Sequence, residues 1–345
     1  PNYRTTMGSP LRWGIASAGK ISHDFVNAVG TLPAADHQVV AVAARKLLDA
    51  EKFATLHGIE RAYEGYQALA KDPNVDVVYI GAVNNAHYEL GVLMLQHGKH
   101  VLCEKPLCLN EGQSKRLVKL ASERNLFLME AIWSRFFPFY RQLRERIDRG
   151  ELGEIREVEV EFGFVLSDVD RLRLKSLGGG TVLDLGVYTI QVCLWAFGGK
   201  APEKVVSSGV TNDEGVDLEV TAELHFPGGG IGRMKTSALR ELKNTAVVRG
   251  SKGSVTLHGF WCPQLLTDVD GKELVDTLPN ARHPFNFTNS CGLRYEAEEV
   301  RQCIVAGRLQ SASVSHVDSL LIARIQDQIR KQVGVVFAED EQFAV

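Results

Sequence analysis

Apolar residues recur in two alternating spacings over the first 130 residues. Between turns, residues 18–32, 49–58, 86–98 and 110–125 carry apolar side chains at helical spacing. Short runs that are almost wholly apolar, typical of strands buried on both faces, stand at residues 11–17, 37–45, 76–82, 100–104 and 126–132. Strands that alternate with helices through short connections predict a parallel, doubly wound sheet.

The pattern changes near Trp133. Residues 138–153 predict a helix, and residues 315–332 predict a second, amphipathic helix. Alternating apolar and polar residues, typical of antiparallel strands with one covered face, fill residues 155–165, 203–211, 218–226, 230–239, 244–251, 253–260 and 263–271. The predicted fold class is α/β, with an N-terminal doubly wound parallel sheet (11–134) and a C-terminal α+β domain (135–345). That domain is expected to hold a large, open, mainly antiparallel sheet, and residues 1–10 are expected to form a flexible leader.

Composition narrows the class of function. The chain has 345 residues and a formal net charge of -3, which gives no electrostatic case for binding nucleic acid or an anionic membrane. No apolar run approaches the roughly 18 residues of a membrane span. The six cysteines form no CxxC pair and no zinc-ligand spacing, so we expect no metal. They are typical of reduced thiols in a cytoplasmic protein.

The first turn carries a dinucleotide fingerprint. Gly14, Ala16 and Gly19 match GxGxxG with alanine at the second glycine, between a strand and a helix whose N-terminus suits a pyrophosphate. The methyl group of Ala16 is expected to hold the phosphates slightly farther out. A tight turn without a cofactor is the alternative, and the position on the first strand favours a Rossmann domain. Expected cofactor contacts are Gly14, Ala16, Ser17, Ala18, Gly19, Lys20 and Ile21.

The end of the second strand bears on the choice of cofactor. NAD-selective sites usually place an acidic residue there for the ribose 2′-hydroxyl, whereas this chain has Ala44, Arg45 and Lys46. An arginine fork suits a 2′-phosphate, so we predict NADP. A solvated surface pair is the alternative.

Three segments carry the candidate chemistry. Glu104, Lys105 and Pro106 follow a predicted parallel strand, where doubly wound sheets bind ligands, and residues 82–87 follow the preceding strand. In residues 178–188, Asp184 and Tyr188 are four apart, which places them on one face of a helix. A tyrosine near a lysine is expected to have a lowered pKa and to exchange a proton with a substrate hydroxyl.

The EKP triplet, and a DxGxY sequence after a GGG loop, resemble the glucose–fructose oxidoreductase/inositol dehydrogenase/rhizopine-catabolism (Gfo/Idh/MocA) family. The resemblance extends from Leu11 to about Asp340. "VLCEKP", "LFLMEAIWSRFFP" and "RYEAEEV" are most similar to the dimeric dihydrodiol dehydrogenases, whose mammalian members also oxidise D-xylose with NADP. The resemblance implies a reversible hydride transfer between nicotinamide and a carbinol carbon of a cyclic diol or sugar.

The resemblance also implies individual roles. Lys105 would donate a hydrogen bond to the reacting hydroxyl, Tyr188 would be the general acid/base, and Asp184 would orient the substrate or the base. Residues on the nicotinamide side would be Asn84, His87, Glu104, Lys105, Trp133 and Arg135. The substrate pocket would be formed by Trp133, Phe162, Tyr188, Trp261 and Phe287.

Two positions depart from the pattern of relatives. Asp49 stands about one turn after Arg45, where relatives that use NADP often carry a second basic residue. Thr288 stands where an acidic residue is expected in mammalian relatives, which leaves the exact substrate open.

Each assignment has a structural alternative. His87 could cap the helix that begins near Ala86, Trp133 and Trp261 could be core aromatics, and Asp184 could satisfy a helix dipole. Tyr188 could be a packed tyrosine with a surface hydroxyl.

Two alternative functions remain open. One is another sugar or polyol oxidoreductase of the family, acting on glucose, 1,5-anhydrofructose or inositol. The other is a non-catalytic NADP-binding sensor. Strands at 219–226 and 245–250 carry enough apolar residues to predict a homodimer formed through the C-terminal sheet, because an open sheet must cover its second face or leave it exposed.

Overall fold

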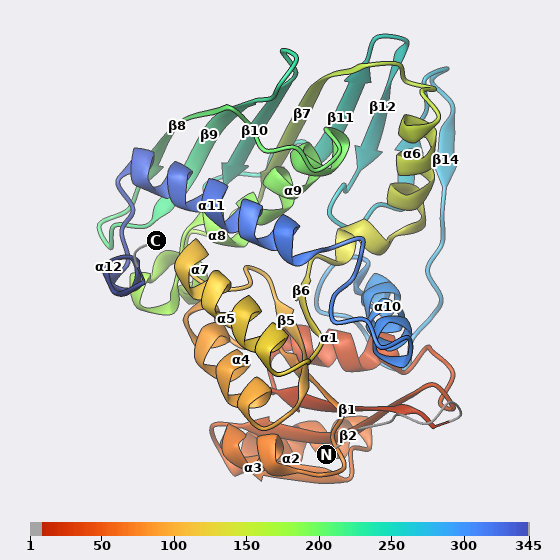
Figure 1. The fold of residues 1–345 in the computed structure, drawn as a ribbon, viewed down its shortest axis with the longest axis vertical. Helices are drawn as coiled ribbons and strands as arrows, with labels where there is room; N and C mark the ends of the chain where they lie inside the picture. Colours follow the sequence, from red (N-terminus) through yellow and green to blue (C-terminus); the bar gives the residue numbers. More distant parts are fainter. Residues whose placement is uncertain (1–8, 344–345) are drawn as a thin grey trace.

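The computed structural model describes residues 9–343, so the expected leader over residues 1–8 lies outside the described residues. The N-terminal sheet is wholly parallel, in the order β3-β2-β1-β4-β5-β6 (Figure 1). Its strands are β1 (Leu11–Ala16), β2 (His37–Ala44), β3 (Arg61–Glu64), β4 (Val77–Ile80), β5 (His100–Glu104) and β6 (Leu128–Ala131). This is the doubly wound Rossmann order, and the predicted fold class of this half is confirmed.

Helices cover both faces of the parallel sheet. One apolar cluster holds side chains of α1 (Lys20–Val29), α2 (Leu47–His57) and α10 (Leu293–Val305). A second cluster holds those of α3 (Tyr66–Lys71), α4 (His87–Gln96) and α5 (Glu111–Glu123). The strand β3 and the helix α3 were not predicted, because β3 is a half-exposed edge strand of four residues without an apolar run.

The C-terminal sheet has eight strands in the order β14-β13-β12-β11-β7-β10-β9-β8. All neighbours are antiparallel except β7 and β10, so the prediction of a mainly antiparallel sheet is confirmed. The strands are β7 (Ile155–Gly163), β8 (Lys204–Thr211), β9 (Asp217–His225), β10 (Ile231–Ser237), β11 (Thr245–Gly250), β12 (Gly253–His258), β13 (Leu265–Thr267) and β14 (Glu273–Val275).

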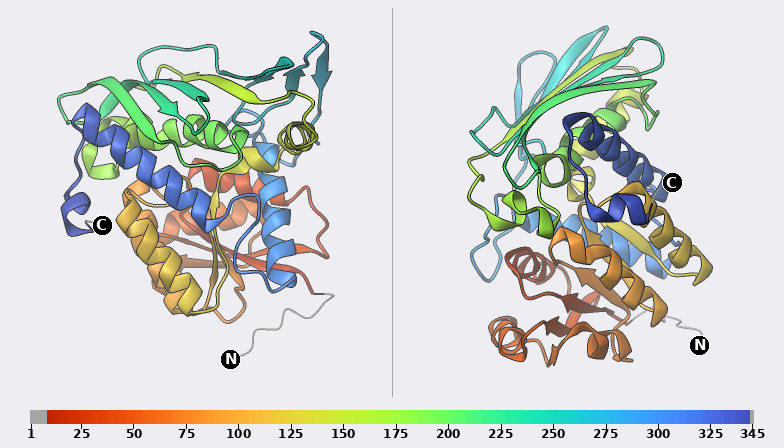
Figure 2. Two further views of the ribbon diagram at one scale, coloured as in Figure 1. Left: turned by 45° about the horizontal axis from the view of Figure 1, so that its top comes forward. Right: turned by 90° about the vertical axis from the view of Figure 1, so that its left-hand side faces the viewer.

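The helices α9 (Gly186–Ala196) and α11 (His316–Val333) lie against one face of this sheet (Figure 2). On β9, Val220, Ala222 and Leu224 point to that buried face, because alternate residues of a strand face opposite sides. A helix predicted over 138–153 is observed as α6 (Pro138–Asp148), beside the same sheet.

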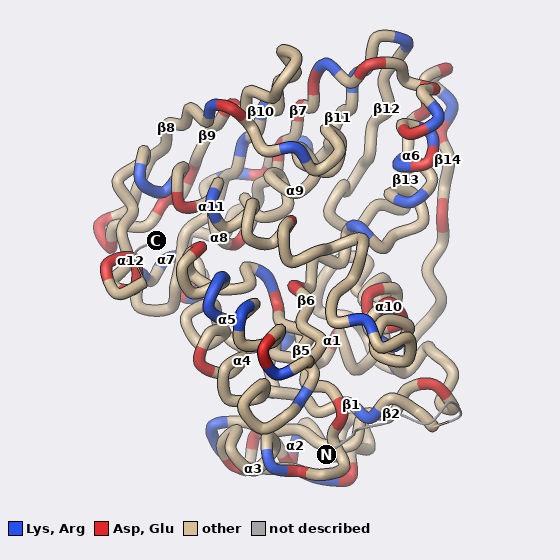
Figure 3. The backbone as a smooth tube through the Cα atoms, in the orientation of Figure 1, with Lys and Arg blue, Asp and Glu red and all other residues tan. Residues whose placement is uncertain are grey.

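The opposite face of the sheet is charged, so the expectation of apolar residues on both sides was wrong. Acidic and basic residues stand side by side on neighbouring strands (Figure 3). Arg249 on β11 pairs with Glu159 on β7 at 2.9 Å, and Arg233 on β10 pairs with Glu157 on β7 and Glu223 on β9. Alternation places these polar positions outward while the apolar positions of the same strands are buried.

One stretch, Lys175–Ala196, is long and apolar enough in composition to cross a membrane, but 94% of its most apolar window is buried within the fold. It is the core segment that carries α8 (Thr181–Asp184) and α9. All six cysteines are buried and unpaired.

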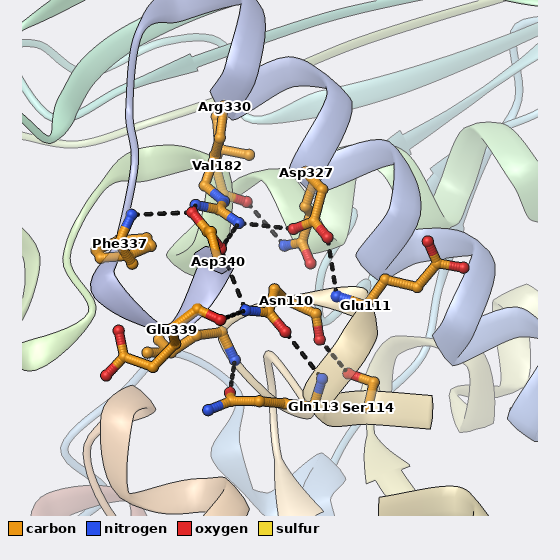
Figure 4. A network of polar contacts seen from close by, with 12 residues as sticks. Asn110, Glu111, Gln113, Ser114, Val182, Asp327, Arg330, Phe337, Glu339 and Asp340 are labelled. Atoms are coloured by element: carbon orange, nitrogen blue, oxygen red, sulfur yellow. Dashed lines mark hydrogen bonds and ion pairs between the residues drawn. The ribbon is translucent and has the colours of Figure 1, made fainter. Parts of the chain in front are cut away.

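A C-terminal arm returns to the N-terminal half after α11 (Figure 4). Arg330 of α11 donates to Asp327 at 2.6 Å and to Asp340 of α12 (Ala338–Gln342) at 2.8 Å. Asn110, which caps α5, donates through Nδ2 to the carbonyl of Glu339 and to Asp340, both at 3.1 Å. The arm therefore holds the N-terminus of α5 against the C-terminal half.

Candidate active site

A cleft of about 990 Å³ opens at the carboxyl ends of β1 and β2. The helix α1 begins beside it at Gly19, which supplies no side-chain cap to the first amides. Uncapped amides at a helix N-terminus suit an anion such as a pyrophosphate, so the site fits the predicted dinucleotide. The lining residues are Ser17, Ala18, Gly19, Lys20, His23, Ala44, Arg45, Lys46, Asp49, Lys52, Phe53, Leu56, Tyr66 and Asn286.

The fingerprint residues divide into two groups. Ser17 to Lys20 line the cleft, whereas Gly14, Ala16 and Ile21 do not. A Cβ at Gly14 would lie 2.9 Å from side chains of Leu69 and Val75, so this glycine permits close packing beneath the sheet. Ala16 is fully buried in an apolar cluster, and the expectation that its methyl group displaces the phosphates was therefore wrong.

The second strand brings Ala44, Arg45 and Lys46 to the cleft, as predicted. Lys52 of α2 lines the same cleft and was not predicted, because the position that relatives fill with a basic residue is Asp49 in this chain. Positions 49 and 52 are three apart on one helix and share a face, which is the signal that could have identified Lys52. Within residues 9–343, no salt bridge engages these basic side chains.

Lys105 lies at the end of β5, next to a cis peptide bond with Pro106. Its Nζ donates to the carboxylate Oδ1 and to the backbone oxygen of Asp184, each at 2.9 Å. The Nζ is also 5.0 Å from the centre of the Tyr188 ring. The three predicted catalytic residues therefore lie together, and the hydrogen-bond partner of Lys105 is Asp184.

The spacing of Asp184 and Tyr188 predicts that they share one helix, but the structure places them on two helices. Asp184 ends α8 and Tyr188 belongs to α9, with Leu185 between the two helices. Burial opposes ionisation of Asp184, but the charges of Arg171 and Lys105 outweigh it and hold the pKa of this carboxyl well below its usual range.

Arg171 is a part of the cluster that the sequence did not reveal. It lies on α7 (Asp170–Arg173), and its NH1 is 2.6 Å from Oδ1 of Asp184. No motif marks this arginine, since nothing in the sequence distinguishes it from Arg173 and Lys175, which follow it before the GGG loop.

Tyr188 is buried, and its hydroxyl oxygen accepts a hydrogen bond from Nε1 of Trp133 at 2.8 Å. The expectation of a lowered pKa was wrong for the free site. Burial and then the charge of Glu104 raise the pKa of Tyr188 well above that of an ordinary phenol. The neutral phenol is therefore the form that this site holds.

Aromatic rings stand beside the Tyr188 ring. The ring of Phe162 on β7 lies 5.5 Å from that of Tyr188 and 4.6 Å from that of Trp261. Trp133, Phe162 and Trp261 thus lie together beside Tyr188, and their role as walls of a substrate pocket stays a prediction.

Phe287 lies elsewhere on the surface. Its side chain is 42% exposed, and its backbone N–H donates to Asp24 of α1 at 2.9 Å. Its neighbour Asn286 lines the cofactor cleft. The segment that contains Phe287 and Thr288 is therefore fastened to the N-terminal half beside that cleft.

His87 is fully buried and faces neither the cleft nor solvent. Its Nδ1 lies 2.7 Å from the carbonyl oxygen of Pro106, and its Nε2 lies 3.1 Å from that of Ala82. It makes no helix-capping hydrogen bond either, because Ala86 occupies the cap position. His87 joins the turns after β4 and β5 and so supports Lys105 from behind.

Three other residues predicted on the nicotinamide side are engaged with protein groups. Asn84 donates to the carbonyl of Gly178 at 2.8 Å, which joins the turn after β4 to the GGG loop. Arg135 pairs with Asp318 of α11 at 3.0 Å and is buried. Glu104 accepts a hydrogen bond of 2.5 Å from the hydroxyl of Tyr79. These contacts fix the loops and helices around the site.

No cluster of three histidine, cysteine, aspartate or glutamate side chains within residues 9–343 is placed to hold a metal ion. The chemistry of the site consists of one buried carboxylate, two cations, a phenol and aromatic walls.

Comparison with known proteins gives relatives over nearly the full chain. Trans-1,2-dihydrobenzene-1,2-diol dehydrogenase of Danio rerio is 45% identical over 333 residues, which cover 96% of this chain and 99% of the relative. The enzyme of the same name from Xenopus laevis is 42% identical over 327 residues, covering 94% and 99%.

Solved structures share the fold. A 3-ketoreductase from Actinomadura kijaniata in complex with NADP has a TM-score of 0.81 at 26% identity, covering 95% of this chain and 99% of that one. A levoglucosan dehydrogenase has a TM-score of 0.81 at 21% identity, covering 94% and 97%.

Residues 11–132 match the GFO/IDH/MocA oxidoreductase family with an NAD-binding Rossmann fold, and residues 140–256 match the GFO/IDH/MocA C-terminal domain. Together with the full-length relatives, these matches show that the chain is an oxidoreductase that belongs to the GFO/IDH/MocA family.

Proposed function

We propose that the protein is an NADP-dependent oxidoreductase that interconverts a carbinol and a carbonyl group of a cyclic diol or sugar. The observation that carries the proposal is the convergence of Lys105, Asp184 and Tyr188 in one buried cluster beside aromatic rings. The names of the relatives support a trans-1,2-dihydrobenzene-1,2-diol as substrate. D-xylose, oxidised at C1, is the sugar that the family resemblance suggests.

NADP is proposed over NAD because the cleft gathers basic side chains where the adenosine ribose is expected. Arg45 and Lys46 follow β2, and Lys52 supplies a third cation from α2. Relatives that use NADP often carry a basic residue at the position of Asp49, and Lys52 would supply that positive charge in this chain. Ser17 to Lys20 and the N-terminus of α1 would hold the pyrophosphate.

The bound nicotinamide would accept a hydride from the carbinol carbon or return it to the carbonyl carbon. Lys105 has three N–H bonds, of which Asp184 takes two, and the third would be given to the substrate oxygen. A hydrogen bond from a cation stabilises negative charge that develops on this oxygen.

Tyr188 would exchange the proton of the substrate hydroxyl. Its raised pKa favours the neutral phenol, which is the form that gives a proton to a carbonyl oxygen during reduction. In the oxidative direction the phenolate must form, and the N–H of Trp133 and the charge of Lys105 stabilise it. Oxidation is therefore expected to speed up as pH rises.

The outer face of the C-terminal sheet bears on the oligomeric state that we propose. We propose a homodimer through the outer face of the C-terminal sheet, which no described helix covers. The ion pairs on this face would make its interface polar and dependent on salt. A monomer in sedimentation at micromolar concentration would contradict the dimer.

The free, buried thiols support a cytoplasmic location. We also propose that residues 11–134 form the cofactor-binding domain and that residues 135–345 form the domain for substrate binding and dimerisation.

A substrate panel tests the proposed function. Turnover would be followed by NADPH absorbance at 340 nm with trans-dihydrodiols, D-xylose, glucose, 1,5-anhydrofructose and inositol, each with NADP and with NAD. The highest kcat/KM is expected for a dihydrodiol or D-xylose with NADP. A clear preference for another sugar would move the enzyme within its family, and NADPH binding without turnover of any substrate would favour a sensor.

A further inference from the structure

One carboxylate oxygen in the catalytic cluster serves two cations. Oδ1 of Asp184 lies 2.9 Å from Nζ of Lys105 and 2.6 Å from NH1 of Arg171. The side chains of Asp184 and Lys105 are 7% and 14% exposed, whereas that of Arg171 is 42% exposed. The arginine thus reaches the buried carboxylate from the solvent-exposed side of the cluster.

The segment that carries Arg171 is held in place from both halves of the molecule. The carbonyl of Gly178 accepts from Asn84, and the carbonyl of Ser176 accepts from Asn85, both at 2.8 Å. Leu172, next to Arg171, is fully buried and accepts from the N–H of Gly180 at 2.8 Å. These contacts fix the arginine relative to β5 and α8, which carry Lys105 and Asp184.

Two cations meet at one oxygen atom in the cluster. Lys105 and Arg171 both contact Oδ1 of Asp184, and Tyr188 is a neutral phenol. Glu104, also at the end of β5, is buried with its pKa raised by that burial and accepts from the hydroxyl of Tyr79. A carboxylate shared between two cations binds each of them less tightly than it would bind one alone.

We propose that Arg171 is a positioning residue of the reaction, which shares the carboxylate of Asp184 so that Lys105 remains available to the substrate oxygen. The inference rests on the proposed function and adds a residue to it. Without Arg171, Asp184 would serve Lys105 alone, and the lysine would be drawn toward the carboxylate and away from the substrate.

The arginine also keeps the carboxylate ionised. The groups that face Asp184 are Lys105 and Glu104 from β5, Arg171 from α7 and Tyr188 from α9. A neighbouring cation lowers a carboxyl pKa by about 1–3 units, so removal of Arg171 should raise that of Asp184. Protonated Asp184 no longer anchors Lys105, and activity would then be lost at a higher pH than in the wild type.

The test compares Arg171→Gln, Arg171→Lys and the control Arg173→Gln. Arg173 lies on the same short helix, but among residues 9–343 its side chain pairs only with Asp170, at the surface. For Arg171→Gln we expect kcat to fall by roughly tenfold to a hundredfold with little change in KM. The kcat profile of this variant should gain a low-pH limb, set by Asp184, at a pH where the wild type keeps its activity. Arg171→Lys should restore most of both, and Arg173→Gln should match the wild type.

A second readout does not depend on turnover. In protein labelled with ¹³C at the carboxyl of aspartate, the resonance missing from Asp184→Asn should stay ionised across the stable pH range and begin to titrate in Arg171→Gln. Labelling aspartate alone leaves Glu104 silent. A titration unchanged by Arg171→Gln would overturn the inference, as would a rise in KM at constant kcat, which would make Arg171 a substrate-binding group. If the wild type turned over no substrate of the panel, the proposed function would fail while this titration still reported on Arg171.

Discussion

Two buried ion clusters in this molecule have opposite composition. In the catalytic cluster, two cations share one carboxylate, since Lys105 and Arg171 both contact Asp184. In the C-terminal arm, one cation is divided between two carboxylates, since Arg330 contacts Asp327 and Asp340.

The two clusters differ in the hydrogen-bonding groups that remain available to a substrate. Both carboxylates of the arm are occupied further by backbone or amide N–H groups, and Arg330 is 2% exposed (Figure 4). The catalytic cluster keeps one N–H of Lys105 beyond the two that Asp184 accepts. A cluster whose carboxylates are all occupied by the protein holds parts of the fold together, whereas one that keeps a lysine N–H can also receive a substrate oxygen.

The largest effect is expected when the catalytic groups of the first cluster are removed. Lys105→Met is expected to lower kcat about 10³-fold, and Tyr188→Phe by a similar factor, because positioned proton transfer contributes about 10²–10⁴. Circular dichroism and NADPH binding should remain close to wild type. Turnover left intact in both variants would remove the catalytic assignment.

The arm should respond in stability and not in chemistry. Arg330→Met leaves the half-buried Asp327 and Asp340 without their cation, which is expected to cost about 1.5–3 kcal/mol of unfolding free energy. Urea denaturation measures this loss, and kcat per folded molecule should change little. A stable but inactive Arg330→Met would show that the arm takes part in the reaction.

Glu130 on β6 contacts the loop of residues 105–110, which joins the two clusters, and it tests how pH affects the stability of that loop. Its Oε1 accepts from the N–H of Leu107 at 2.9 Å, and burial raises its pKa to about 7. A raised carboxyl pKa contributes stability below the unfolded value near 4.5, and this contribution is lost as pH rises from there through 7.

We therefore expect Glu130→Gln to gain about 2–3 kcal/mol of unfolding free energy relative to wild type between pH 5 and pH 7.5. Urea unfolding at the two pH values gives the difference. A constant difference would mean that Glu130 does not change its charge in this range.

The smallest effect concerns the cofactor cleft, which is lined by Arg45, Lys46 and Lys52. Arg45→Ala should raise KM for NADP about 10–100-fold and leave KM for NAD nearly unchanged, because a hydrogen bond to a charged group contributes about 1.5–3 kcal/mol. Steady-state kinetics with both cofactors measure this. Lys52→Ala should shift the preference in the same direction, and a preference unchanged in both variants would contradict the 2′-phosphate site.

The sequence predicted those parts of the structure that depend on neighbours along the chain. Apolar runs marked five of the six parallel strands, and the ends of those strands placed Lys105 at the ligand edge of the sheet. The edge strand β3 has no such run and was missed. Arg171 and the C-terminal arm were missed because their roles depend on contacts between segments far apart in sequence.

The signs of the pKa shifts were also beyond the sequence. Proximity of Lys105 suggested a lowered pKa for Tyr188, yet desolvation outweighs that charge once the ring is buried. The alternation along β9 indicates a polar outer face, because Val220, Ala222 and Leu224 all point to the buried face and Glu219, Thr221 and Glu223 to the other.

The anchoring of Asn110 by Glu339 and Asp340 has a consequence for biosynthesis. Lys105 and Asn110 begin and end one loop, which leaves the ribosome long before the arm that fastens its far end. The Rossmann half can fold early during translation, but its catalytic loop acquires its last anchor only when the final helix emerges. A ribosome stalled shortly before α12 would therefore carry a folded cofactor domain with an unfinished active site.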